Sequence, residues 1–296
     1  MLTVNPATIK TSDLHAYMLA AIAPRPIAFA STVDAAGKPN LSPFSFFNAF
    51  GSKPPVLVFS PARRVRDNTT KHTLQNVLAT KEVVINVVNY AMVQQQSLAS
   101  TEYEAGVNEF IKAGLTPVAS ELVKPFRVKE SPVQMECKVL DVIETGNQGG
   151  AGNLIVCEIM LMHINETILD VNQKIDPYKI DLVARLGGDW YCRASGNALF
   201  EVAKPLTTKG MGIDQLPEQI RNSQILTGND LGKLGNTEHI PTTDEIKMFE
   251  QENEGILLKQ QLQQVAGNKD AQHRMAQSLL QNGKVKQAWF VLMMHN

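Results

Sequence analysis

The chain has few cysteines, and those it has are not arranged for metal binding or cross-linking. Only three occur among its 296 residues, namely Cys137, Cys157 and Cys192. They lie far apart, form no C-x-x-C motif and have no histidine pair near them. This spacing argues against a disulfide framework and against a metal site. We therefore expect no metal.

Long apolar runs and a strong excess of either charge are also missing. No apolar segment approaches the roughly 18 residues needed to cross a membrane, and the first residues lack the basic and apolar regions of a secretory leader. The formal net charge of -1 argues against a surface that binds nucleic acid in general. We expect a cytoplasmic protein without membrane or nucleic-acid partners, in which any basic patch is local and matched to a small anion.

What the sequence does contain is a folded, strand-rich first part. Hydrophobic residues make up 44% of the chain and charged residues 19%, as in globular proteins. Residues 26–33 and 40–47 are extended runs joined by turn residues, which predicts a β-hairpin. Short Val-rich segments at 54–60 and 82–88 predict buried strands, and residues 72–80 and 91–100 predict helices. Many short strands with few helices indicate a barrel.

A second hairpin is predicted further along the chain. Residues 133–139 alternate apolar and polar side chains, the pattern of a strand with one face in the core and the other in water. The glycine-rich stretch 146–153 interrupts this pattern, and an apolar strand resumes at residue 154. We interpret the glycines as a flexible hairpin loop, with a phosphate-cradling role as the alternative.

After about residue 200 the sequence becomes polar and glutamine-rich, and its pattern predicts helices. We therefore predict a β-rich domain over residues 1–199 and a helical C-terminal extension over 200–296. Thr242 and Glu245 form a capping-box pattern, and the apolar residues that follow predict one amphipathic helix of about twenty residues, with its stripe on Ile246, Phe249, Ile256 and Leu257. Residues 271–280 and 285–294 also read as helical. We expect the amphipathic helix to pack across a neighbouring subunit or over a ligand pocket.

The most unusual local feature is a basic segment at residues 59–77, FSPARRVRDNTTKHTLQNV. Arg63, Arg64, Arg66, Lys71 and Thr73 stand between a predicted strand and a predicted helix. Charge-assisted donors beside a helix N-terminus suit a phosphate monoester. A solvated basic loop is the alternative that the cluster alone does not exclude.

The strand before this segment is suited to a flat heteroaromatic ring. The text SPFSFFN, residues 42–48, places small hydroxyl residues, aromatic residues and an asparagine on closely spaced backbone. Backbone groups can reach the polar edge of a ring while side chains cover its faces. The alternative is a strand whose aromatic residues lie in the core.

Taken together, these segments resemble the flavin reductase-like family, which includes flavoredoxin and the FMN-binding split-barrel reductases. The resemblance rests on IAPRPIAFASTV (22–33), GKPNLSPFSFFN (37–48), PPVLVFS (54–60) and KHTLQNV (71–77), in this order and spacing. It extends through residues 82–88, the strand beginning at residue 154 and VARLGGDWY, and so covers roughly residues 10–195. The implied fold is mainly β with α (α+β), a six-stranded FMN-binding split β-barrel, here with its C-terminal helical extension.

The resemblance also implies a cofactor, an assembly and a set of contacts. FMN would be held non-covalently in a homodimer, near the subunit interface. Ser31 and Thr32 would lie beside the flavin. The isoalloxazine would be lined by Ser45, Phe46, Phe47 and Asn48, and the phosphate would be bound by Ser60, Arg63, Lys71 and Thr73.

The chain departs from the family pattern at one position, and the roles of a few other residues have alternatives. The family has Lys-Asp-Thr where this chain has His72 between Lys71 and Thr73, and a histidine cannot orient a neighbouring base as an acidic residue does. Trp190 and Tyr191 either cover a flavin in the partner chain or are two buried aromatic residues at a turn. His163 is a candidate catalytic residue at the redox edge of the flavin, with a core histidine as the alternative.

The predicted function is FMN-dependent oxidoreduction. Electrons would pass from NADH or NADPH through bound FMN to free flavin, iron or a protein. The sequence contains no Ser/His/Asp triad, paired carboxylates or metal cluster, which fits an enzyme whose cofactor carries the chemistry. The alternatives are an FMN-binding electron carrier or sensor without NAD(P)H activity, and a scaffold that has lost flavin binding.

Overall fold

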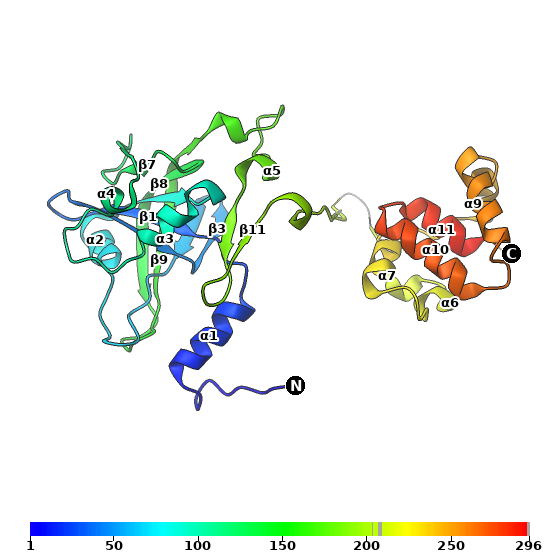
Figure 1. Ribbon diagram of the computed structural model, residues 1–296, viewed down its shortest axis with the longest axis horizontal. Coiled ribbons are helices and arrows are strands. Elements are labelled where there is room, and N and C mark those ends of the chain that lie inside the picture. Colours follow the sequence, from blue (N-terminus) through cyan, green and yellow to red (C-terminus); the bar gives the residue numbers. More distant parts are fainter. Residues whose placement is uncertain (203, 207–208, 295–296) are drawn as a thin grey trace. The chain divides into compact units, whose positions relative to one another are not determined.

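A computed structural model describes residues 1–202, 204–206 and 209–294. The chain divides into two compact units, Met1–Phe200 and Glu201–Asn296 (Figure 1). The first contains a large sheet and the second is helical. Each has its own buried core, and each is described by itself.

An antiparallel seven-stranded sheet, in the order β2-β1-β5-β8-β9-β4-β3, organises the first unit. Its strands are β1 (Ala28–Val33), β2 (Pro39–Phe44), β3 (Phe47–Ser52), β4 (Pro55–Phe59), β5 (Glu82–Val87), β8 (Val133–Glu144) and β9 (Asn153–Ile164). Two short antiparallel pairs are also present: β6 (Pro117–Val118) with β7 (Arg127–Val128), and β10 (Val183–Arg185) with β11 (Tyr191–Arg193).

The first predicted hairpin is confirmed, but its second arm is two strands rather than one. β1 pairs with β2 as expected. The extended run then breaks after Phe44 and resumes at Phe47 as β3, on the opposite edge of the sheet. Ser45 and Phe46 therefore carry the chain across the split between the two edges. This break is why the sheet has seven strands where the resemblance implies six.

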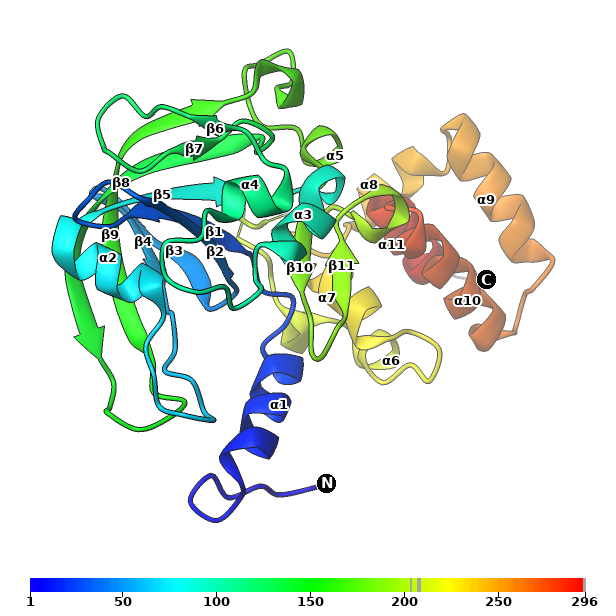
Figure 2. The ribbon, with the colours of Figure 1, turned by 60° about the vertical axis from the view of Figure 1, so that its left-hand side comes forward.

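β1 is buried on both faces and lies between two clusters of apolar side chains. All six of its residues are buried. One cluster joins the sheet to α2 (His72–Thr80) and includes Ala30, Phe59, Ile85, Leu74 and Val77. The other joins the opposite face of β1 to α3 (Val93–Leu98) and α4 (Glu109–Ala113), and includes Phe29, Leu41, Met92 and Phe110. Figure 2 shows α2 and the α3–α4 pair flanking β1 and β2.

The β8–β9 hairpin follows the predicted alternation, with one exception. The four apolar residues expected in the core are buried: Val133, Met135, Cys137 and Val139. Glu136, expected to face water, is fully buried as well. Its carboxylate accepts hydrogen bonds from the backbone N–H groups of Glu121 (2.9 Å) and Leu122 (2.6 Å). These bonds satisfy the carboxylate and make its burial tolerable.

Cys137 and Cys157 lie inside the barrel core on neighbouring strands, and neither is exposed to solvent. Both are free thiols. The neighbouring Cys157 thiol, followed by burial, raises the pKa of the Cys137 thiol. The pair is therefore part of the packing.

The N-terminal helix α1 (Thr11–Ala21) stands away from the sheet in both ribbon views (Figures 1 and 2). None of its residues is buried. The short helix α5 (Pro177–Ile180) also belongs to the first unit. In the described part of the chain, no helix combines the length and the apolar character that a membrane crossing requires.

The second unit is a set of helices around an apolar core. They are α6 (Glu218–Arg221), α7 (Gly228–Gly235), α8 (Thr243–Phe249), α9 (Asn253–Gln263), α10 (Lys269–Gln281) and α11 (Val285–Met293). Trp289 is 1% exposed, and the rings of Phe249 and Phe290 stack with their centroids 4.0 Å apart. The predicted helices at 271–280 and 285–294 correspond to α10 and α11.

The prediction of one amphipathic helix over residues 242–265 is wrong. The capping box of Thr242 and Glu245 is present, but α8 ends at Phe249 and α9 begins at Asn253. Ile256 and Leu257 are exposed, whereas Leu258 and Leu262 enter the core of this unit. Two of the four predicted stripe residues, Ile246 and Phe249, therefore pack within their own unit, whereas Ile256 and Leu257 do not. That the stripe packs across a subunit or over a ligand pocket stays a prediction.

Candidate functional site: a basic pocket at the N-terminus of α2

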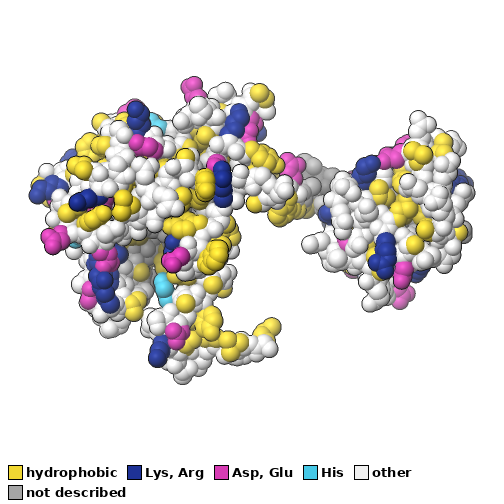
Figure 3. All heavy atoms as spheres, in the orientation of Figure 1, with side chains coloured by type: hydrophobic (Ala, Val, Ile, Leu, Met, Phe, Trp, Pro, Cys, Tyr) yellow, Lys and Arg dark blue, Asp and Glu magenta, His cyan; other side chains and the backbone are white. Residues whose placement is uncertain are grey.

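The basic loop between β4 and α2 lies against the glycine-rich loop between β8 and β9. Arg63 N–H donates to the carbonyl of Ala151 (2.8 Å), and Gly150 N–H donates to the carbonyl of Arg63 (3.0 Å). A Cβ at Gly149 would come within 3.0 Å of the backbone oxygens of Arg64 and Val65. The predicted hairpin loop is thus confirmed, and glycine there permits close backbone packing. Figure 3 shows Lys and Arg side chains gathered over this region of the first unit.

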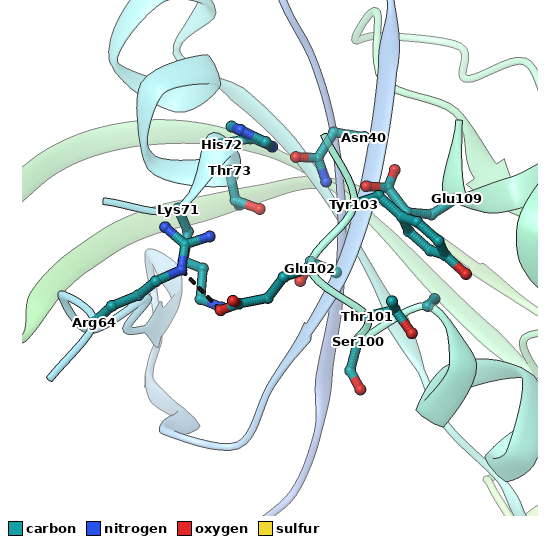
Figure 4. A pocket seen from close by; sticks show the side chains of 12 residues that line it. Asn40, Arg64, Lys71, His72, Thr73, Ser100, Thr101, Glu102, Tyr103 and Glu109 are labelled. Atoms are coloured by element: carbon teal, nitrogen blue, oxygen red, sulfur yellow. Dashed lines mark hydrogen bonds and ion pairs between the residues drawn. The ribbon is translucent and has the colours of Figure 1, made fainter. Parts of the chain in front are cut away.

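Three cations of the basic segment converge on one carboxylate, and Figure 4 shows two of them, Arg64 and Lys71, beside Glu102. Glu102 Oε1 accepts from Arg64 Nε at 2.8 Å and from Lys71 Nζ at 3.0 Å, while Arg66 bonds to Oε2. Hydrogen bonding from Arg64 and then from Lys71 lowers the pKa of Glu102 to about 2. Sequence reasoning missed Glu102, because it lies far along the chain from its partners and belongs to no local pattern.

Arg63, which the resemblance places at the phosphate, makes its side-chain contacts with the loop itself. Its guanidinium donates to Asn68, from Nε to the side-chain oxygen at 2.7 Å and from Nη2 to the backbone oxygen at 2.9 Å. Asn68 in turn donates to the carbonyl of Asn147 (2.9 Å). Arg63 therefore braces the two loops, and the arginine that lines the pocket is its neighbour Arg64.

The pocket closes on the N-terminus of α2. Lys71 occupies the N-cap position and provides no side-chain cap, because an ammonium group has no acceptor atom. The first turn of α2 contains Thr73, which is 1% exposed and whose Oγ1 has no hydrogen-bond partner in the described residues. Figure 4 shows Thr73 and His72 on the side of the pocket opposite Glu102. Free helical N–H groups, a positive dipole end and an unpartnered hydroxyl together favour an anion.

The free volume of the pocket is small. It is about 30 Å³, with a polar lining that includes Asn40, Ser42, Tyr103 and Glu109. This is room for about two water molecules. Burial raises the pKa of Glu109, whose carboxylate accepts the N–H of Leu41 at 3.0 Å.

Ser31 and Thr32 are adjacent buried residues of β1 with different surroundings. Thr32 Oγ1 accepts from Asn76 Nδ2 of α2 at 3.0 Å. Ser31 is opposite Leu41 in the ladder, on the other face of the strand, and its buried Oγ has no partner among the described residues. Neighbouring residues of a strand point to opposite faces. That both residues lie beside the flavin, as the resemblance implies, stays a prediction.

Residues 45–48 come together with Ser60 at the split of the barrel. Ser60 N–H donates to the carbonyl of Phe46 (2.9 Å), and Ser60 Oγ accepts from Asn153 N–H (3.1 Å). The Phe46 ring meets His15 of α1 edge to face at 6.1 Å. Phe47 packs against the barrel core, and Asn48 is exposed. These residues form a partly open corner, whereas the hydroxyl of Ser60 is already engaged outside the pocket.

Arg25 holds this corner and was not predicted. Its side chain is buried and donates to Ser45 Oγ (3.3 Å) and to the carbonyls of Leu19, Ile22 and Leu186. Burial, followed by the charge of Arg185, lowers its pKa. Arg25 thus ties the end of α1 and the turn before β11 to the corner. The only sequence signal was an arginine between two prolines.

His163 lies away from the other candidates. It stands near the end of β9, with Nε2 2.8 Å from the buried Glu136. Asn153, the partner of Ser60, begins the same strand, and ten residues of strand span roughly 30 Å. The geometry therefore favours the alternative of a histidine satisfied within the fold.

Trp190 and Tyr191 lie at the β10–β11 turn, and they differ in exposure. Trp190 is 75% exposed, so the alternative of two buried aromatic residues is wrong. Tyr191 is partly buried beneath the guanidinium of Arg185, at 4.6 Å from the ring centre. In the described residues, no three His, Cys, Asp or Glu side chains are grouped so as to hold a metal ion.

The ion pairs of Glu102 should appear in the acid stability of the first unit. Because its pKa is depressed, the carboxylate contributes stability above its ordinary value of 4.5, and this is lost as the pH falls toward about 2. We expect the free energy of unfolding to fall less steeply over this window in Glu102→Gln than in the unmodified chain. Urea unfolding of the sheet unit at a series of pH values measures the difference. Parallel curves would contradict it.

The comparisons with known proteins agree with this architecture. Residues 20–177 match the model of the flavin reductase like domain. An uncharacterized protein of Aquifex aeolicus is 39% identical over 197 residues, 66% of this chain and 98% of that protein. Nitrilotriacetate monooxygenase component B from Bacillus cereus is 27% identical, with a TM-score of 0.64 over 68% of this chain and 98% of that one.

Flavoredoxin of Desulfovibrio vulgaris shares the fold, at 23% identity and a TM-score of 0.53 over 69% of this chain and 98% of its own. The family match lies entirely within the sheet unit. The predicted resemblance and fold class are therefore confirmed. The matched domain spans more than half of the chain, and the chain belongs to the flavin reductase like family.

Proposed function

We propose that this chain is an FMN-dependent oxidoreductase that takes electrons from NADH or NADPH and passes them to free flavin, iron or a protein. The observation that carries the proposal is the pocket at α2. There Arg64 and Lys71 lie beside an uncapped helix N-terminus and the unpartnered hydroxyl of Thr73. Membership of the flavin reductase like family supports a flavin as the rest of the ligand.

The residues present fit FMN at its phosphate end. A phosphate monoester accepts several charge-assisted hydrogen bonds, which Arg64, Lys71 and the first turn of α2 can donate. The ring needs more room than the pocket has. Ser42 lines the pocket and Ser45 opens the corner three residues later, roughly 10 Å along an extended strand. We propose that the ribityl chain bridges this distance and that the ring lies against residues 45–48.

A homodimer would complete the site. The proposed ring position is partly open, β3 is mostly exposed, and α1 buries none of its residues in the single chain. Phe50 on β3 is 68% exposed. A second copy that covers this edge would exclude water from the ring. The proposed homodimer would be detected by its mass in sedimentation or light scattering.

When bound, FMN supplies hydride acceptance and electron transfer. The chain's own residues bind and orient it. Arg64 and Lys71 fix the phosphate, and Arg25 holds Ser45 and so the shape of the corner. Asn48 is exposed and its Oδ1 accepts the N–H of Ala49 at 2.8 Å, so it would meet the polar edge of the ring as a donor, through Nδ2. No strong acid or base is required of the protein.

We expect FMN to bind at least tenfold more tightly than riboflavin, because the neutral flavin lacks the group that the pocket receives. FAD should also bind more weakly, since it presents a diester with further bulk. Calorimetry with the three flavins measures this, and equal affinities would contradict it. Oxidation of NADH or NADPH by the FMN-loaded protein then separates an oxidoreductase from an FMN-binding carrier or sensor, which would show none.

A further inference from the structure

The pocket of Arg64 and Lys71 already contains an anion, and that anion belongs to the chain. Glu102 reaches into it from the segment between α3 and α4 (Figure 4). One of its oxygens is shared by Arg64 and Lys71, at 2.8 and 3.0 Å. The carboxylate therefore takes up the same donors that the proposed phosphate needs.

Charge and space both prevent the two anions from being bound together. Arg64, Arg66 and Lys71 are paired here with Glu102 and Asp67, which leaves one net positive charge. A phosphate dianion would reverse the sign while Glu102 remains, and would balance the charge once Glu102 has left. The free volume of about 30 Å³, with Glu102 in the lining, holds little more than water.

The segment that carries Glu102 is built to move without breaking the fold. Within the described chain, the backbone hydrogen bonds that residues 100–107 donate are local, to carbonyls of Ser97, Leu98, Thr101 and Glu104. The side chain of Glu102 is about one-third exposed (34%). Its ion pairs with the basic loop are the main polar link between this segment and α2, and they are exchangeable with an incoming anion.

We propose that Glu102 is an internal competitor for the phosphate site, which holds Arg64 and Lys71 until a phosphate monoester displaces it. The inference rests on the proposed function, and it adds a determinant of specificity. A neutral flavin offers these cations nothing in exchange for Glu102, so it cannot open the pocket. A phosphorylated flavin can, and segment 100–108 becomes free when it binds.

Glu102→Gln tests the proposal, with Glu104→Gln as the matched control, since Glu104 is exposed, lies on the same segment and does not line the pocket. In Glu102→Gln we expect FMN to bind about tenfold more tightly, because the competing charge is gone. Inorganic phosphate should compete with FMN at a correspondingly lower concentration. Riboflavin affinity should not change, and Glu104→Gln should match the unmodified chain throughout.

Hydrogen exchange of the unmodified chain provides a second test that needs no variant. Saturation with FMN should increase exchange in segment 100–108, while riboflavin leaves it unchanged. Weaker or unaltered FMN binding in Glu102→Gln would overturn the proposal, as would protection of segment 100–108 by FMN.

The failure of this inference and that of the proposed function give different results. A chain that does not bind FMN at all overturns both. A chain that prefers FMN to riboflavin, but whose Glu102→Gln variant binds it no better, keeps its function and loses only the competitor.

Discussion

Alanine at both Arg64 and Lys71 should lower the affinity for FMN by about 10²- to 10⁴-fold and leave the barrel folded. Each hydrogen bond to a charged group contributes about 1.5 to 3 kcal/mol, so the loss of two removes about 3 to 6 kcal/mol of binding free energy. Both side chains belong to the loop outside the core clusters. Calorimetric titration with FMN measures the effect, and circular dichroism checks the fold.

Arg63→Ala is the control for this double variant. Arg63 is adjacent to Arg64 in sequence, but its guanidinium is bonded to Asn68 rather than directed into the pocket. We expect Arg63→Ala to change FMN affinity much less than the double variant does. A larger loss from Arg63→Ala would show that the phosphate binds beside Arg63 and would refute the assignment of the pocket.

Trp289→Ala should destabilise the helical unit by about 3 to 5 kcal/mol, the usual loss for a large buried aromatic residue. Trp289 is 1% exposed and donates from Nε1 to Thr237 Oγ1 at 3.2 Å. A unit of this size has only about 5 to 15 kcal/mol of stability in total, so a substantial fraction of it would be lost. Because the sheet unit has its own core, we expect FMN binding to survive. Calorimetric unfolding should show a lower midpoint temperature for the helical unit and an unchanged midpoint for the sheet unit.

The chain's other tryptophan provides the matched control. Trp190 is 75% exposed at the β10–β11 turn, and surface changes of this kind usually alter stability by less than about 0.5 kcal/mol. Trp190→Ala should leave both transitions in place. If Trp289→Ala instead lowers both transitions together, the two units unfold as one and the assumption of independence is wrong.

The periodicity of apolar residues was sufficient to predict elements such as β8 and α2. The alternation from Val133 to Val139 predicted β8, and the apolar positions of residues 72–80 predicted α2. Breaks set by tertiary contacts were missed. Nothing in the text distinguishes Ser45–Phe46 from a continuing strand, because the break arises from barrel closure. The gap between α8 and α9 depends on close packing of Gly255 against the carbonyl of Phe249, where a Cβ would collide.

The sequence predicted which segments form the site, but not which side chains meet there. The basic segment and the corner at residues 45–48 are where the sequence indicated, since both follow from short motifs. Which of two adjacent arginines enters the pocket depends on a brace between loops 79 residues apart, from Asn68 to Asn147. Glu102 was invisible for the same reason, since its ion pairs join segments with no common periodicity. Its role as a competitor follows only from seeing all three cations on one carboxylate.

The buried thiols of Cys137 and Cys157 allow opening of the barrel to be measured by chemical labelling. Cys137 and Cys157 have no exposed surface, and the neighbouring Cys157 thiol and burial raise the pKa of the Cys137 thiol, which disfavours the thiolate. Only a thiolate that solvent can reach reacts with alkylating reagents. The partly exposed Cys192 is accessible in the folded chain, whereas the buried pair can be alkylated only when the barrel core opens to solvent. The ratio of the two labelling rates therefore reports how often the barrel opens, without any engineered probe.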